Sequence, residues 1–71
     1  MNDVQRHSVR KEVDKLIVLV GGDYSKITST HIANLMEYFE TITESYWPAW
    51  AIMRYIEVRM FGWKEVMKLM R

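Results

Sequence analysis

Cysteine is absent from this 71-residue chain, so no disulfide can form and the redox compartment is left open. No apolar run approaches the roughly 18 residues that span a bilayer. Residues 1–15 also lack the apolar core of a signal peptide. We therefore expect a stand-alone cytoplasmic protein without a transmembrane segment, whose fold depends on packing alone.

Motifs for catalysis, nucleotide binding and metal binding are also missing. The Gly21-Gly22 pair is not followed by the residues of a phosphate-binding loop. His7 and His31 are the only imidazoles, and they fall in different predicted helices without the spacing of a zinc motif. No serine lies in a nucleophile motif. The sequence predicts a non-enzymatic protein with no metal and no cofactor.

Apolar residues, in contrast, are abundant. They make up 49% of the chain, and aromatic residues make up 13%. A chain of this length forms one domain, residues 1–71, and buries only about 60% of the surface that its unfolded state exposes. This excess of apolar surface predicts a homodimer or another protein partner, with a tightly packed small bundle as the alternative.

Two helices are predicted in the first two thirds of the chain. The first covers residues 2–20, is capped by Asn2 or Asp3, and is stopped by Gly21. The second begins at the capping residue Thr28 and ends in the break before Pro48. Apolar residues recur on one face of each helix: Val9, Val13, Leu16, Ile17 and Val20 in the first, and Ile32, Leu35, Met36, Phe39, Ile42 and Tyr46 in the second.

Three glutamates, Glu37, Glu40 and Glu44, fall together on the outer side of the second helix. They could serve as acid–base or cation-binding carboxylates. We interpret them instead as a solvated helix face, which is the commoner use of such spacing.

The last third of the chain carries the most regular pattern. Its apolar residues are spaced by 4, 3, 4, 3, 4 and 3 positions, the rhythm of a seam between helices: Ala49, Met53, Ile56, Met60, Trp63, Met67 and Met70. Gly62 would cost about 1 kcal/mol inside a helix, but the spacing continues across it. We predict an all-α fold, a small three-helix bundle with a long, central C-terminal helix from Pro48, and a bend at Gly62 as the alternative.

Arg59 lies within the apolar arc of this predicted helix. A charge there either extends along its methylene stem to solvent or meets a carboxylate such as Asp14 or Glu44.

The polar side of the same helix mixes basic and aromatic residues. Such a mixture is typical of binding surfaces, where tryptophan and arginine are enriched. The predicted partner-binding residues are Trp50, Arg54, Phe61, Lys64, Met67, Lys68 and Met70. We predict a small regulator, adaptor or inhibitor that acts by binding another protein.

Two alternatives remain from the sequence. The second and third helices could form a helix-turn-helix-like pair that binds DNA, although the three glutamates beside them would repel phosphate. Residues 48–71, with five Lys or Arg against two Glu, could attach to an anionic membrane. The net charge of +1 favours neither.

Overall fold

The computed structural model describes residues 1–69, and these form four α-helices, one short 3₁₀ helix and no strand. The elements are α1 (Asp3–Leu19), η1 (Tyr24–Lys26), α2 (Ser29–Thr43), α3 (Ala49–Phe61) and α4 (Trp63–Leu69). The predicted all-α class is confirmed. The prediction of three helices is wrong by one, because the last third of the chain contains two.

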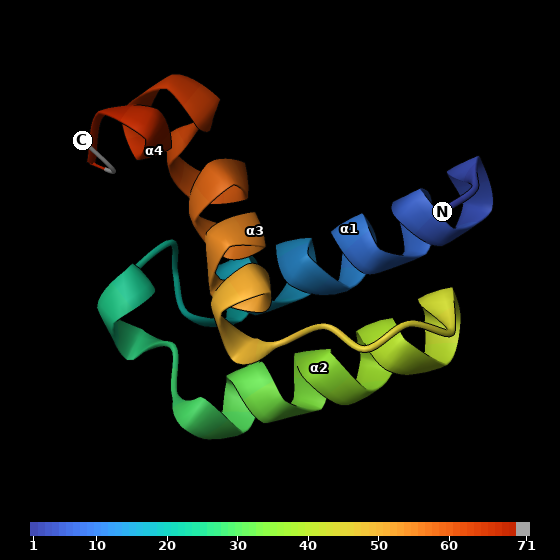
Figure 1. The fold of residues 1–71 in the computed structure, drawn as a ribbon. Coiled ribbons are helices and arrows are strands. Elements are labelled where there is room, and N and C mark those ends of the chain that lie inside the picture. Colours follow the sequence, from blue (N-terminus) through green and yellow to red (C-terminus); the bar gives the residue numbers. More distant parts are fainter. Residues whose placement is uncertain (70–71) are drawn as a thin grey trace.

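The helices build two layers (Figure 1). α1 and α2 run side by side in opposite directions, and α3 crosses over them. Residues 44–48 return along α2 from its C-terminal end before α3 begins. At its far end α3 gives way to α4, which turns away from the α1–α2 layer.

Local hydrogen bonds set the ends of α1 as the sequence predicts. The Asn2 side chain accepts from the Gln5 backbone N–H at 2.8 Å, and the Gln5 side chain accepts from the Asn2 N–H at 3.0 Å. At the other end, Gly21 and Gly22 have positive φ, and their N–H groups donate to the carbonyls of Val18 and Ile17. This is the glycine-dependent stop that ends many helices.

Thr28 caps α2, again as predicted. Its hydroxyl accepts from the His31 N–H at 3.3 Å, and the Nδ1 atom of His31 accepts from the Thr28 N–H at 3.0 Å. His31 therefore takes the place that glutamate or glutamine occupies in a standard capping box.

The hydrophobic core lies between the two layers. Its most buried members are Val9, Val13, Leu16, Val20, Ile32, Leu35, Phe39, Ile52 and Ile56. On α1 and α2 these residues belong to the predicted inner faces. Tyr46, predicted to belong to the inner face of the second helix, lies beyond the end of α2 and is 71% exposed.

On α3 the predicted seam is largely wrong. Of its members in the described part of the chain, Ile56 is buried and Met60 is half-buried, whereas the others are exposed: Ala49, Met53, Trp63 and Met67. The core is reached by Ile56 of the seam together with Ile52, both with 0% exposure. Neighbouring side chains on a helix point about 100° apart. Because Ile52 is buried and Met53 is not, the face of α3 that meets the core differs from the predicted one.

The predicted continuous helix from Pro48 is also wrong, and the bend at Gly62 is the correct alternative. The Gly62 N–H closes the last turn of α3 by donating to the Val58 carbonyl at 2.9 Å. Gly62 then adopts φ 89° and ψ 154°, outside the helical region and accessible almost only to glycine. The chain therefore changes direction there, although the apolar spacing continues through it.

A long-range ion pair fixes α3 across α1. The Arg59 guanidinium donates from Nε to Asp14 Oδ1 at 2.8 Å and from Nη2 to Asp14 Oδ2 at 2.9 Å. Of the two carboxylates that the sequence offered, Arg59 meets Asp14. Its hydrogen bonds hold the pKa of Asp14 below the ordinary value for an aspartate.

The register of α3 can be tested with two neighbouring substitutions. Ile52→Ala removes a fully buried side chain and should lower the free energy of unfolding by about 2–5 kcal/mol. Met53→Ala, at a side chain that is 40% exposed, should cost less than about 1 kcal/mol. Urea denaturation measures both. A larger cost for Met53→Ala would restore the seam predicted from the spacing.

The ion pair predicts a specific pH dependence of stability. Because the pKa of Asp14 is lowered in the fold, the pair stabilises above the unfolded-state pKa of about 3.9, and this stability is lost as pH falls through the folded pKa. Asp14→Asn should cost less than about 1 kcal/mol at neutral pH, since the pair is partly exposed.

Thermal melts from neutral pH to pH 2.5 should therefore converge for wild type and Asp14→Asn at the acid end. Glu37→Gln, at an exposed carboxylate with no ion pair within residues 1–69, is the control. A gap between wild type and Asp14→Asn that persists undiminished at pH 2.5 would contradict the role of the pair.

Candidate binding groove on α3

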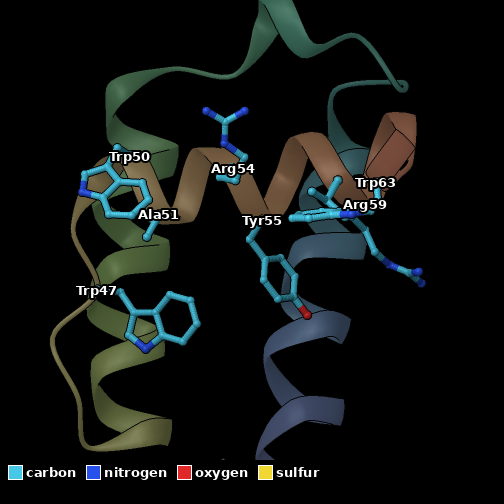
Figure 2. A pocket seen from close by; sticks show the side chains of 8 residues that line it. Trp47, Trp50, Ala51, Arg54, Tyr55, Arg59 and Trp63 are labelled. Carbon is cyan, nitrogen blue, oxygen red and sulfur yellow. The ribbon is translucent and has the colours of Figure 1, made fainter. Parts of the chain in front are cut away.

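A groove of about 540 Å³ runs along one flank of α3, beside the core. Its lining residues come from the loop before α3, from α3 itself and from the first residue of α4: Trp47, Trp50, Ala51, Arg54, Tyr55, Val58, Arg59 and Trp63. Figure 2 shows these side chains, with Trp47 and Trp50 near one end and Arg59 and Trp63 near the other. The groove therefore extends over most of α3, which is about 20 Å long.

The floor of the groove is held by aromatic contacts to Phe39, a fully buried residue of α2. Trp47 meets the Phe39 ring edge-on with centroids 5.1 Å apart, and Tyr55 does so at 5.5 Å. The Trp47 Nε1–H donates to Thr43 Oγ1 at 3.0 Å, and that hydroxyl donates to the Phe39 carbonyl at 2.7 Å. Burial raises the pKa of Tyr55. These contacts preform the floor and orient two of its rings.

The two ends of the groove carry exposed tryptophans. Trp50, in the first turn of α3, is 69% exposed, and Trp63, the first residue of α4, is 60% exposed. Ala51 and Val58 provide small apolar surface between them. Two large rings with free surface at the ends of one apolar groove form a site that can hold apolar side chains of a ligand.

The charges at the rim are balanced. Arg54 Nη1 lies 3.8 Å from Glu57 Oε1, and Arg59 is bound by Asp14. The hydrogen bonds to the Asp14 carboxylate raise the pKa of Arg59. The groove thus combines an apolar interior with two cations whose charges are already compensated.

The opposite flank of α3 is covered by η1. Tyr24 approaches Phe61 with ring centroids 6.1 Å apart, and its hydroxyl donates to Glu57 Oε2 at 3.4 Å. Burial, followed by the Glu57 carboxylate, raises the pKa of Tyr24. Phe61 therefore packs beside Tyr24 and does not line the groove.

The predicted partner-binding residues are only partly brought together. Trp50 and Arg54 line the groove, whereas Phe61 lies beside Tyr24. Lys64, Met67 and Lys68 are on the surface of α4, where Lys68 Nζ lies 3.3 Å from Glu65 Oε1. Met70 lies outside the described residues.

Reasoning from the sequence missed several groove residues. The spacing predicts Trp63 in the seam, and Trp47 falls in the break before Pro48, yet both line the groove. Ala51, Tyr55 and Val58 are spaced by 4 and 3 positions, which is itself a helical stripe. The spacing shows this stripe, but it does not show that the stripe is exposed. The reason is that α3 has more apolar residues than one face can hold, so the sequence does not say which of them are buried.

Other kinds of site are not formed by the described residues. Within residues 1–69, no three His, Asp or Glu side chains come together in a way that could hold a metal ion. No helix in this part of the chain combines the length and the apolar character needed to cross a membrane.

The break at Gly62 positions Trp63, and it can be tested. A Cβ at Gly62 would meet no other atom within 4 Å, so the cost of Gly62→Ala is one of backbone conformation. We expect a loss of about 1–3 kcal/mol in the free energy of unfolding. Lys64→Ala, at an exposed position of α4, is the control and should change it by less than about 0.5 kcal/mol.

Calorimetric or denaturant melts, read together with circular dichroism, measure this effect. A Gly62→Ala variant that is more stable and more helical than wild type would mean that α3 and α4 readily merge into one helix. The groove would then lose the change of chain direction at Gly62 that places Trp63 at its end.

Comparison of this chain with protein-family models, with curated proteins and with solved structures finds no match. Its function is therefore inferred from the groove and its surroundings.

Proposed function

We propose that this chain is a non-enzymatic protein-binding module that holds an apolar segment of a partner protein in the groove of α3. The observation that carries the proposal is the pair of exposed tryptophans, Trp50 and Trp63, at the two ends of one preformed apolar groove. A regulator, adaptor or inhibitor of a larger protein works through such a surface.

The energetics favour the aromatic residues as the source of affinity. Burying a large apolar side chain contributes about 1.5–3 kcal/mol, and both tryptophans have most of their surface left to bury. Exposed ion pairs contribute at most about 1 kcal/mol each. Arg54 and Arg59 are therefore assigned to orientation and to the rate of association.

The floor of the groove supports the same proposal. Trp47 and Tyr55 are held against Phe39 before any partner arrives. A binding surface that is already ordered loses little conformational freedom on association. The partner therefore gains most of the energy of burying its apolar side chains.

DNA binding and membrane attachment receive less support from this surface. Each groove arginine lies beside a carboxylate, Glu57 or Asp14, so a phosphate backbone following the groove would meet balanced charge. Within the described residues, α4 has seven residues, which is short for a helix that lies in a membrane surface.

The proposal is tested with a groove variant and a matched aromatic control. Tagged wild type, the double variant Trp50→Ala/Trp63→Ala and Tyr46→Ala serve as baits in extract from the source cells. Tyr46 is 71% exposed and lies outside the groove lining. We expect a protein that wild type and Tyr46→Ala retain equally and that the double variant retains about tenfold less or weaker still.

Two results would contradict this function. A partner retained equally by all three baits would exclude the groove as its binding site. Retention of DNA that falls steeply with salt and ignores the tryptophans would favour the electrostatic alternative.

A further inference from the structure

A second surface, separate from the tryptophan pair, is formed by α1 and the end of α3. Five side chains surround an open hollow of about 520 Å³, here called the basic hollow: His7, Arg10, Lys11, Asp14 and Arg59. Its one carboxylate, Asp14, is already bound by Arg59 through two hydrogen bonds. Arg10 and Lys11 form no ion pair within residues 1–69. The hollow therefore has uncompensated positive charge.

The opposite charge gathers on α2. Glu37, Glu40 and Glu44, here called the acidic ridge, are all exposed. The spacing of Glu37 and Glu40 puts them on one side of α2, and Glu44 is the left-handed residue that caps the C-terminal end of α2. Residues 27–47 contain no Lys or Arg, and none of the three glutamates forms an ion pair within the described part of the chain. The acidic ridge is therefore uncompensated too.

The two surfaces match in length, and they belong to helices that run side by side. Each spans seven residue steps, from His7 to Asp14 and from Glu37 to Glu44, or about 10 Å at the helical rise. The Gln5 Nε2–H donates to the Ile42 carbonyl at 3.0 Å, which puts the N-terminal half of α1 beside the C-terminal half of α2 (Figure 1). His7 and Arg10 of the basic hollow therefore lie in the half of α1 that runs beside the half of α2 carrying the acidic ridge.

We infer that the occupant of the basic hollow is the acidic ridge of a second copy of this chain. About a two-fold axis, each copy supplies its ridge to the other's hollow. Two-fold dimers are the commonest symmetric assemblies. The net charge of +1 leaves little overall repulsion to oppose this association.

This arrangement leaves the tryptophans of the groove outside the dimer contact. Arg59 borders both the basic hollow and the groove, but its charge is engaged by Asp14. The dimer and the proposed partner can therefore be tested independently. Because its charges are exposed, the dimer contact should weaken as salt is added.

A charge exchange provides the test. Sedimentation equilibrium at low salt should show wild type approaching about 17 kDa, twice the 8.5 kDa of one chain, and returning toward one chain mass at about 0.5 M salt. Arg10→Glu and Glu40→Lys should each lower the association constant by about tenfold or more. An equimolar mixture of the two variants should restore it, because each then offers the charge that the other lacks.

Two controls keep the test decisive. Circular dichroism checks the fold of each variant, and Lys11→Glu with Glu37→Lys forms a second exchange pair if one variant fails to fold. Trp50→Ala/Trp63→Ala should dimerise like wild type. Loss of the dimer in that variant would place the contact in the groove and overturn the inference.

Three further results would also overturn it. These are a single-chain mass for wild type at every concentration, a dimer insensitive to salt and to the charge variants, and a mixture that fails to restore association. If wild type keeps the mass of a single chain and retains duplex DNA in a way that depends on Arg10, the basic hollow binds phosphate instead of the acidic ridge. None of these results would affect the partner proposed for the tryptophan groove.

Discussion

The packing of α3 across the α1–α2 layer is the constraint on which the rest of the structure depends. Ile52 and Ile56 of α3 are fully buried, and the Arg59–Asp14 pair links α3 to α1. The described residues 1–69 form no third layer over the side of α3 that carries Ala51 and Val58. The apolar residues there, with Trp50 at their edge, consequently stay open to solvent and form the groove.

Glycine at position 62 completes that groove. If α3 continued as a straight helix, Trp63 would lie about 100° around the axis from Gly62 and one step further along it. The extended ψ of Gly62 instead starts a new helix, and the first side chain of that helix lines the groove. A residue that interrupts secondary structure thus contributes to the site by redirecting a tryptophan, while the Phe39 contacts keep the floor rigid.

Charge is distributed around this apolar framework in a consistent way. Where a cation borders the groove, as at Arg54 and Arg59, a carboxylate accompanies it. Uncompensated charge lies elsewhere, positive at Arg10 and Lys11 and negative along the acidic ridge. The groove is therefore suited to ligands recognised by shape and apolar contact, and the outer surfaces are suited to recognition by charge.

The sequence by itself determined the helical class, the caps at Asn2 and Thr28, the stop at Gly21 and the buried faces of α1 and α2. These features depend on short-range hydrogen bonds and on one apolar stripe per helix, both of which are visible in a few neighbouring residues. The tertiary structure alone decided which face of α3 is buried and where Trp63 lies. The reason is that α3 carries two apolar stripes one residue apart, led by Ile52 and Met53, and local spacing cannot rank them. Only packing against side chains from distant parts of the chain, such as Phe39 and Asp14, selects between them.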